Sequence, residues 1–344
     1  MYSFSNLISI GVQCMRWGQN VPPEFYWLIN HTLAPRLAPQ FGIIQSCTAM
    51  SSLYFQTTPA ISIHAQLTLP TESNSQKPLI VFLHYWGGSS STWHKLTTPD
   101  TPISLAALYP TLAVDLRGWG KSTGAAGVHE NEYSITAMAS DIATLLSQMN
   151  TESNYKDLFQ HGLVLVGHSM GAKIAIASLS LLSQGLQALL KGLIFVTPAP
   201  PTALNLPADM KAQQQVAYES EEAIRWTIAN VLANSENLTD SDTSLIVQNS
   251  LGGNPLAKKA WPMYGMQEDV SQQAAQALGT YYNLRASIIV GEFDVVEPKE
   301  RVKAEVVNFL TRNKVEVTFK TVKGVKHLIP LENPVSIHEE VCKF

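Results

Sequence analysis

The sequence predicts an α/β fold in which helices cover both faces of a mostly parallel central sheet. From about residue 52 onward, short apolar runs rich in β-branched residues alternate with runs of helical periodicity. Several of these apolar runs are continuous, which is typical of strands buried on both faces. The chain has 344 residues, of which 45% are hydrophobic and 15% are charged, so it can bury a large core.

The expected strands follow one another from residue 52. SLYFQT and ISIHAQLTLP predict an antiparallel opening pair, and TESNSQKP after them is a turn by composition. Further strands are expected, in chain order, at 79–86, 111–116, 162–167, 192–197, 286–291 and 315–322. Helices are expected at 133–149, directly after the strand at 162–167, and at about 299–310, because apolar residues recur there with the helical period.

Two regions interrupt this alternation. Residues 201–279 contain helical patterns and no convincing strand, which predicts a helical cap inserted into a core formed by residues 51–200 and 280–344. Residues 1–50 form an amino-terminal extension, with a helix expected after a pair of prolines. This extension is aromatic and poor in charge. We therefore expect it to pack against its own body or against a second copy in a homodimer, with a lipid surface as the alternative.

Composition excludes several classes of protein. The net charge is −4 and no basic stripe is visible, which argues against a nucleic-acid partner. Cys14, Cys47 and Cys342 lie far apart, which argues against a zinc site or a disulfide framework and favours a reducing compartment. No apolar run approaches the ~20 residues of a membrane span, and the first residues lack the basic region of a secretory signal. We expect a cytoplasmic protein without a transmembrane segment.

Two stretches match the pattern G-x-S-x-G, namely GKSTG with Ser122 and GHSMG with Ser169. Ser169 follows a predicted buried strand and is followed at once by a helix, so a sharp turn would lift its hydroxyl clear of the sheet. The small residues Gly167 and Gly171 would let that strand and helix approach each other. Ser122 lies in a glycine-rich loop whose spacing fits neither a phosphate-binding loop nor a dinucleotide fingerprint. Ser169 is the predicted nucleophile.

A serine hydroxyl needs a base that removes its proton during attack, usually a histidine held by a carboxylate. His327, in KGVKHLIPLENP, follows the last predicted strand and is expected at the carboxyl end of the sheet, as Ser169 is. In IIVGEFDVVEP, Asp294 falls where strand gives way to loop and is the predicted acid, with Glu292 and Glu297 as alternatives. The chain order is that of a serine triad on such a sheet.

Taken in order, LIVFLHYWGGS, AVDLRGWGKS, LVGHSMG, IIVGEFD and the loop at His327 resemble the α/β-hydrolase superfamily, and most of all its esterase and cofactor-free haloperoxidase branch. The resemblance covers about residues 52–344. It implies a catalytic triad of Ser169, Asp294 and His327, and an oxyanion hole made by the backbone N–H groups of Trp86 and Met170. It implies no metal and no organic cofactor.

One position departs from the pattern of these relatives. Many of them read H-G-W-G-G where this chain reads HYWGG, so Tyr85 stands in place of a glycine. Because tyrosine rarely adopts a positive φ, we expect a different backbone path here, and a phenol that can project into the pocket as a hydrogen-bond donor. Of the nearby histidines, His168 is expected to pack at the nucleophile turn and His84 to support a loop by hydrogen bonding.

The predicted function is hydrolysis of a carboxylic ester, a lactone or a thioester through an acyl-enzyme. The aromatic and methionine side chains of the predicted cap indicate a small apolar acyl substrate, although they can equally pack the cap onto the core. The same triad could serve a non-hydrolytic acyltransferase, lyase or cyclase that tailors a natural product. A binding protein without catalysis is the third alternative.

Overall fold

The computed structural model describes residues 50–70, 75–124 and 130–344. The described strands form one sheet in the order β1-β2-β4-β3-β5-β6-β7-β8. Their bounds are β1 Met50–Thr58, β2 Ile61–Thr68, β3 Leu79–Leu83, β4 Thr111–Val114, β5 Leu163–His168, β6 Leu190–Val196, β7 Arg285–Gly291 and β8 Glu316–Val322. β2 pairs antiparallel with β1 and β4, and the other pairs are parallel. The predicted fold class is therefore confirmed, as is the antiparallel opening pair.

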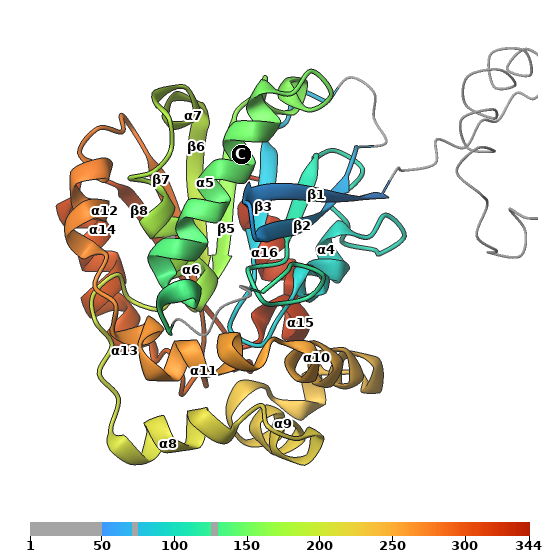
Figure 1. The fold of residues 1–344 in the computed structure, drawn as a ribbon, viewed down its shortest axis with the longest axis vertical. Helices are drawn as coiled ribbons and strands as arrows, with labels where there is room; N and C mark the ends of the chain where they lie inside the picture. The colour runs from blue at the N-terminus through green and yellow to red at the C-terminus, as the bar shows by residue number, and fades with distance from the viewer. Residues whose placement is uncertain (1–49, 71–74, 125–129) are drawn as a thin grey trace, which may run out of the picture. The chain divides into compact units, whose positions relative to one another are not determined.

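Helices cover both faces of this sheet (Figure 1). In β3 the odd-numbered side chains enter one hydrophobic core and the even-numbered ones enter the other, because side chains alternate along a strand. The first core is completed by α5 (Ile135–Thr151) and α6 (Met170–Ser178), and the second by α4 (His94–Thr97) and α16 (Pro334–Val341). Burial on both faces explains why the sequence shows these strands as unbroken apolar runs.

The other helices outside the β6–β7 connection are short. They are η2 Ser90–Trp93, η3 Glu130–Tyr133, η4 Lys156–Phe159, α7 Gln184–Leu189, α13 Lys299–Arg301, η8 Val302–Val307, α14 Asn308–Arg312 and α15 Ile329–Glu332. The helix expected at about 299–310 is present as the continuous run from α13 to α14, whose middle part is π-helical. The turn after β5 leads directly into α6, as predicted.

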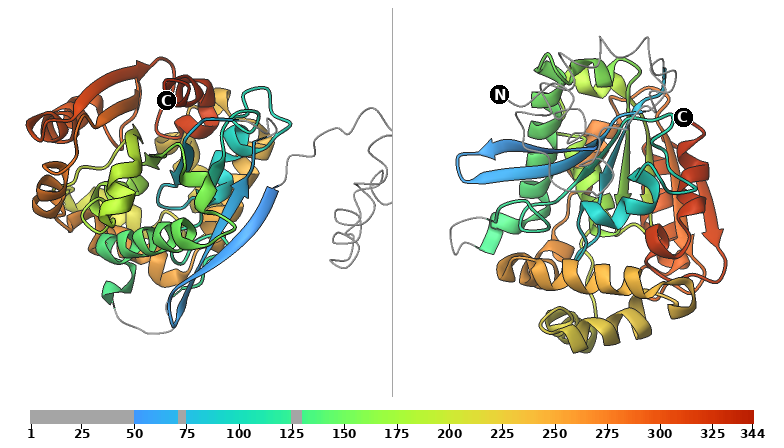
Figure 2. Two further views of the ribbon diagram at one scale, coloured as in Figure 1. Left: turned by 90° about the horizontal axis from the view of Figure 1, so that it is seen from above. Right: turned by 90° about the vertical axis from the view of Figure 1, so that its right-hand side faces the viewer.

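The connection between β6 and β7, residues 197–284, contains helices and no strand. We call it the β6–β7 insert. Its helices are α8 Ala208–Val216, α9 Glu221–Thr227, η5 Ile228–Leu232, η6 Ser235–Asn237, α10 Asp240–Gly252, α11 Pro255–Met263, η7 Gly265–Gln267 and α12 Ser271–Leu278. In Figures 1 and 2, α8 to α11 form a layer across the end of the sheet at which the parallel strands stop. Residues from this layer can therefore reach the loops that follow β3, β5, β7 and β8.

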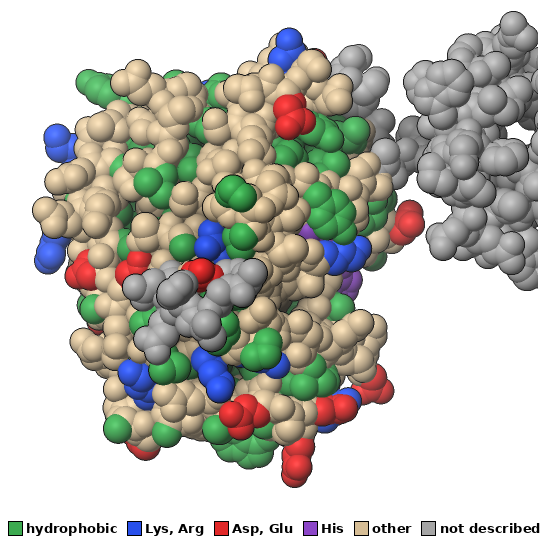
Figure 3. Space-filling view, viewed as in Figure 1, with side chains coloured by type: hydrophobic (Ala, Val, Ile, Leu, Met, Phe, Trp, Pro, Cys, Tyr) green, Lys and Arg blue, Asp and Glu red, His purple; other side chains and the backbone are tan. Residues whose placement is uncertain are grey.

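The expected amino-terminal extension lies almost wholly outside the described residues, so its helix, its packing and the homodimer stay predictions. Within the described residues, no helix is both long and apolar enough to cross a membrane. On the face shown in Figure 3, acidic and basic side chains are interspersed and do not gather into one patch.

Candidate active site

Ser169 occupies a strained turn between β5 and α6. Its backbone has φ 53° and ψ −114°, a combination that non-glycine residues rarely adopt. A Cβ atom added at Gly167 would lie 2.5 Å from the Cα of Ala172, and one added at Gly171 would clash with the carbonyl oxygen of Leu83. Glycine at both positions therefore lets α6 begin directly against the ends of β5 and β3.

His327 and Asp294 meet at the same end of the sheet. Nδ1 of His327 lies 2.8 Å from Oδ2 of Asp294, and both side chains are buried. The other carboxylate oxygen, Oδ1, accepts hydrogen bonds from the backbone N–H groups of Val296 (2.8 Å) and Glu297 (3.0 Å), which fix its orientation. With Nδ1 donating to Asp294, the Nε2 atom of His327 is the ring nitrogen left for chemistry.

Ser169 and His327 line one cavity of about 230 Å³. The structure thus brings together the three residues that the sequence nominated: two on the cavity wall and Asp294 behind the histidine. The alternative acids have other partners. Glu292 accepts a hydrogen bond from the backbone N–H of Gly324, and Glu297 accepts one from Arg301.

The loop that carries His327 is tied to both the core and the β6–β7 insert. His168, at the end of β5, donates from Nε2 to the backbone oxygen of His327 (2.9 Å). Burial lowers the pKa of His168 well below its ordinary value, so this ring is neutral. The backbone N–H of His327 donates to the carbonyl oxygen of Leu232 in the insert (2.9 Å). His168 packs at the turn as expected, and it also holds the loop opposite the serine, which the sequence did not indicate.

Two groups at this site have a pKa shifted upward from its ordinary value. Burial disfavours the protonated ring of His327, but Asp294, together with Glu297 and Glu332, outweighs burial and raises the pKa of His327 above 6.5. Burial raises the pKa of Glu297 to about 7, although Arg301 acts in the opposite direction. Glu297 is 1% exposed and its charge acts on His327. It therefore contributes to the electrostatics of the site without contacting the histidine nitrogen that faces the cavity.

The loop after β3 forms a further wall of the cavity and accommodates Tyr85 without strain. The positive φ in this loop falls at Gly87 (97°) and not at Tyr85, so the expected conflict with the tyrosine backbone does not arise. The Tyr85 ring lines the cavity, but its hydroxyl hydrogen-bonds with Ser250, whose own hydroxyl donates to the carbonyl oxygen of Gly87 (3.0 Å). Tyr85 thus lines the cavity as expected, and its role as a hydrogen-bond donor to a substrate stays a prediction.

His84 supports this loop, as the sequence predicts. Its Nε2 accepts from the backbone N–H of Leu116 (3.0 Å), so the proton sits on Nδ1, which donates to the carbonyl oxygen of Tyr85 (2.7 Å). Burial lowers the pKa of His84 to about 4, which keeps this bridging ring neutral.

Residues of the β6–β7 insert also contact the loop that follows β3. The hydroxyl of Tyr218 donates to the carbonyl oxygen of Trp86 (2.9 Å), and the two rings lie 4.2 Å apart between centroids. The indole N–H of Trp86 donates to the carbonyl oxygen of Lys258 (3.0 Å). A Cβ added at Gly87 would lie 2.5 Å from the Tyr218 ring, so glycine is required for this approach. The insert contacts were not visible in the sequence.

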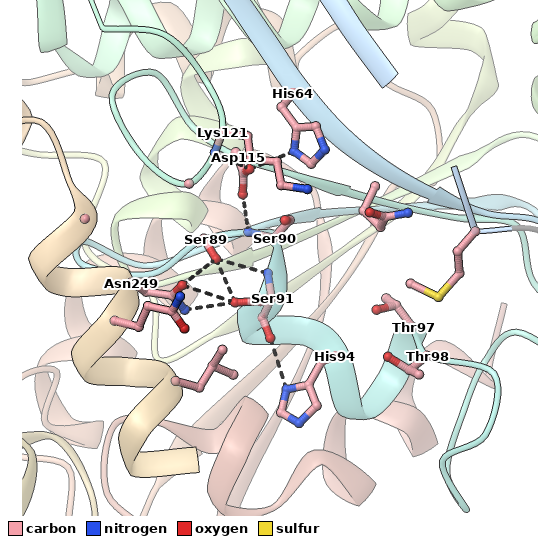
Figure 4. A pocket seen from close by; sticks show the side chains of 16 residues that line it. His64, Ser89, Ser90, Ser91, His94, Thr97, Thr98, Asp115, Lys121 and Asn249 are labelled. Carbon is pink, nitrogen blue, oxygen red and sulfur yellow. Dashed lines mark hydrogen bonds and ion pairs between the residues drawn. The ribbon is translucent and has the colours of Figure 1, made fainter. Parts of the chain in front are cut away.

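A second, larger cavity of about 480 Å³ contains neither Ser169 nor His327 (Figure 4). Its polar lining includes His64, Ser89, Ser90, Ser91, His94, Asp115, Lys121 and Asn249. Figure 4 shows a network in which Asn249 bonds with Ser89 and Ser91. Among the described residues, no cluster of three or more His, Cys, Asp or Glu side chains could hold a metal ion.

Beside this second cavity lies another serine, histidine and aspartate. His64 bonds through Nδ1 to Oδ2 of Asp115 (2.7 Å), while its Nε2 has no partner among the described residues. The hydroxyl of Ser122 donates to the backbone oxygen of Asp115 (2.6 Å) and accepts from the backbone N–H of His64 (2.8 Å). Both polar contacts of the Ser122 hydroxyl are thus with the backbone, and the Asp115 carboxylate accepts from the backbone N–H groups of Ser90 and Lys121 and so holds the neighbouring loops.

Comparison with known proteins identifies the family to which this chain belongs. The profile of a family described as "Alpha/beta hydrolase family" matches residues 80–339. Protein phosphatase methylesterase 1 from Bos taurus is 25% identical over 205 residues, which cover 57% of this chain and 50% of that protein. This chain spans about half the length of the curated relatives that it matches first.

Solved structures share the fold. An esterase from Thermogutta terrifontis superposes with a TM-score of 0.60 at 21% identity, covering 86% of this chain and 97% of that one. A bromoperoxidase from Bacillus anthracis superposes with a TM-score of 0.65 at 17% identity, covering 85% and 99%. At these low sequence identities the structural similarity shows a shared fold only.

Proposed function

This chain belongs to the alpha/beta hydrolase family, and we propose that it is a serine hydrolase that cleaves a carboxylic ester, a lactone or a thioester. One observation supports this proposal above the others. Ser169 and His327 line the same cavity, and the second ring nitrogen of His327 is held by the buried carboxylate of Asp294. This is the arrangement by which a histidine activates a serine hydroxyl.

In the proposed reaction, Oγ of Ser169 attacks the carbonyl carbon while Nε2 of His327 takes its proton. Asp294 holds the Nδ1 proton and stabilises the imidazolium that forms. The tetrahedral intermediate collapses, the C–O or C–S bond breaks, and His327 protonates the departing alcohol or thiol. Water then attacks the acyl-enzyme with His327 as base, which releases the acid and restores Ser169.

The oxyanion is stabilised, in this proposal, by the backbone N–H groups of Met170 and Trp86. Met170 is the first residue of α6, where an N–H has no partner inside the helix and the helix dipole favours negative charge. Gly171 brings this helix end against the end of β3, whose following loop carries Trp86. Removing one such donor typically costs about 10²–10³ in turnover.

Residues 201–279 act as a cap over this site, and the core comprises residues 51–200 and 280–344. The cap supplies apolar side chains to the cavity wall, among them Leu206, Met210, Ala217, Val231 and Leu232. Together with a volume of about 230 Å³, this lining favours a small apolar acyl group.

The test is hydrolysis of a panel of methyl esters with short and long acyl chains, together with labelling by a fluorophosphonate probe. The wild-type chain should hydrolyse short esters in preference, and Ser169→Ala should abolish both hydrolysis and labelling. In ¹⁸O-water the released acid should carry solvent oxygen. Formation of a new ester or amide in place of the acid would favour acyl transfer, and a wild type that does not react with the probe beside a control hydrolase that does would favour a binding protein.

A further inference from the structure

We propose that Glu332 is a positioning residue for the hydrolytic reaction, because its carboxylate fixes the loop that carries His327 and joins this loop to the β6–β7 insert. The inference rests on the proposed function, since it takes His327 as the base that activates Ser169. Glu332 does not line the cavity of these two residues, so it acts through the backbone on either side of His327.

The carboxylate of Glu332 binds the residues immediately before and after His327. Its Oε1 atom accepts hydrogen bonds from the backbone N–H groups of Lys326 (3.2 Å) and Leu328 (3.1 Å). The backbone nitrogen of Lys326 also lies 3.2 Å from Oε2. Glu332 is the last residue of α15, the short helix that begins two residues after His327. These bonds therefore close the chain around the histidine into a compact loop, and a shift of its backbone would strain them.

The same carboxylate reaches the β6–β7 insert. Its Oε2 atom accepts from the backbone N–H of Asn234 (2.8 Å) and from the side-chain amide of Asn237 (3.4 Å). Both residues lie just after η5, whose last residue, Leu232, accepts the backbone N–H of His327 (2.9 Å). The last carbonyl groups of a helix have no donor inside the helix, so they can accept such a bond. Glu332 and the end of η5 thus hold the insert and the histidine loop together.

This set of donors suits a carboxylate. Both oxygens of Glu332 accept, and together they bind four N–H groups. A carboxylate has two acceptor oxygens and no donor, whereas a glutamine side chain has one oxygen and one NH₂ group. In either orientation of a glutamine, the NH₂ group would face N–H donors of the loop or of the insert.

The position of the His327 backbone matters for proton transfer. A base must lie within hydrogen-bond reach of the proton that it takes, about 2.6–3.2 Å between heavy atoms, and a displacement of about 1 Å can cost about 100-fold in rate. Asp294 holds the ring of His327 through Nδ1 (2.8 Å). That bond orients the ring correctly only if the backbone that carries the ring is fixed as well. Glu332 fixes this backbone.

Glu332→Gln and Glu332→Asp separate the position of the base from the charge near it. Glu332→Gln removes one acceptor and the charge, so kcat should fall about 10-fold and the midpoint of the pH profile should fall by about half a unit. The charge of Glu332 raises the pKa of His327 alongside Asp294 and Glu297, and His168, which also faces the ring, is neutral.

Glu332→Asp keeps the charge but is one CH₂ group too short to span both sets of donors. Its kcat should fall as in Glu332→Gln, while the midpoint of its pH profile should stay at the wild-type value. In both variants KM for a short ester should change by less than about twofold, because Glu332 does not line the cavity. Burial raises the pKa of Glu332 above 4.5, so kcat is compared on the alkaline plateau of the profile, where this carboxyl is ionised.

Glu268→Gln is the matched control. Glu268 is half-buried, as Glu332 is, and its carboxylate ties the insert to α5 by accepting the backbone N–H groups of Ile135 (2.6 Å) and Thr136 (3.0 Å). These bonds do not involve the loop around His327. The control should unfold at a lower urea concentration than the wild type, as Glu332→Gln should, but keep the wild-type kcat and pH midpoint.

The outcomes separate this inference from the function on which it rests. All rates are expressed per folded molecule, from urea unfolding curves, and if Glu332→Gln does not fold, the kcat of Glu332→Asp decides the question. A kcat within about threefold of the wild type, a loss that appears in KM alone, or an equal loss of kcat in Glu268→Gln would overturn the inference and leave the hydrolase intact. Failure of the wild type to hydrolyse any ester in a Ser169-dependent manner would overturn the proposed function itself.

Discussion

Two clusters of serine, histidine and aspartate lie in this molecule, and by residue type they are the same. The site cluster consists of Ser169, Asp294 and His327, and the brace cluster consists of Ser122, Asp115 and His64. The histidine Nδ1 lies 2.8 Å from its aspartate in the first and 2.7 Å in the second. Each serine also stands in a G-x-S-x-G stretch. Motif and His–Asp distance do not distinguish them.

The two clusters differ in the surroundings of the serine hydroxyl. In the brace cluster, Ser122 gives its proton to a backbone oxygen and receives a backbone N–H, so it holds two loops together. In the site cluster, Ser169 sits at a positive φ on the wall of a cavity that His327 also lines. The contrast teaches that a histidine held by a carboxylate is common structural chemistry. The strained turn that presents the serine to a cavity is the informative feature.

Replacing each serine by alanine gives the largest expected contrast. Ser169→Ala should lower kcat/KM for a short ester by at least about 10⁴, because the attacking atom is gone. Ser122→Ala should keep kcat/KM within about threefold but lower the free energy of unfolding by about 1–3 kcal/mol, because two buried backbone groups lose their partner. Ester hydrolysis and urea unfolding measure the two effects. A loss of activity in Ser122→Ala at unchanged stability would move the nucleophile to residue 122.

Replacing each aspartate by asparagine separates the clusters further. Asp294→Asn should lower kcat by about 10³–10⁴, because the amide cannot stabilise the protonated ring of His327. Asp115→Asn should act on stability, since Asp115 also accepts from the backbone N–H groups of Ser90 and Lys121. We expect a loss of about 2–4 kcal/mol with kcat of the folded enzyme unchanged. Equal effects on kcat would contradict the distinction.

The acid dependence of stability should follow Asp115 as well. Burial raises the pKa of this carboxyl, but its hydrogen bonds from His64, Lys121 and Ser90 outweigh burial and hold the pKa below 3.8. Its contribution to stability is therefore present above about pH 3.8 and is lost as the pH falls through the folded-state pKa. Unfolding curves at decreasing pH should show this loss in the wild type and not in Asp115→Asn.

The sequence was sufficient for the parts of the site that are local. Ser169, Asp294 and His327 each follow the end of a strand, and those strands are visible as unbroken apolar runs because both faces of the sheet are covered. A strand end is a local signal, so nominating a residue there requires no knowledge of distant packing. The same holds for the sheet itself and for the helix that begins after Ser169.

The contacts between the β6–β7 insert and the core left no local signal in the sequence from which they could be predicted. Tyr218 lies 132 residues from Trp86 in the chain, and nothing periodic links a helix end in the insert to the loop after β3. The pKa of Glu297 depends on burial and on Arg301, which only the folded chain defines. The pairing of His64 with Asp115 was likewise hidden, because it joins β2 to a loop after β4.

Substitutions at two residues of the insert can show which of its contacts with the loop after β3 affects catalysis. Tyr218→Phe keeps the ring against Trp86 and removes only the hydrogen bond to its carbonyl oxygen. We expect kcat to fall about 10-fold with little change in KM, because the loop that carries the proposed oxyanion donor is less well fixed. Asn249→Ala, which removes bonds to Ser89 and Ser91 beside the brace cluster, should leave kcat unchanged and lower the free energy of unfolding by about 1 kcal/mol. A lower kcat in Asn249→Ala alone would reverse the assignment.

The smallest expected effect is on the pH profile of the site cluster. His327 must be neutral to accept a proton, and its pKa is above 6.5, so kcat/KM should rise with pH through a midpoint above 6.5. Besides Asp294, the carboxylates of Glu297 and Glu332 raise this pKa. Glu297→Gln removes one of them and should move the midpoint down by about half a unit with the plateau nearly unchanged. Glu292→Gln, whose carboxylate binds the backbone of Gly324, is the control and should not move it.

Stability gives this last prediction an independent readout. Burial raises the pKa of Glu297 to about 7 in the folded chain, against 4.5 for an ordinary glutamate. The folded state therefore binds the proton more tightly than the unfolded state, so this group makes the protein less stable as the pH rises from about 4.5 to 7. Glu297→Gln should flatten that part of the stability profile. An unchanged or steeper profile would mean that folding does not raise the pKa of Glu297. A midpoint that moves upward would mean that the charge of Glu297 does not raise the pKa of His327.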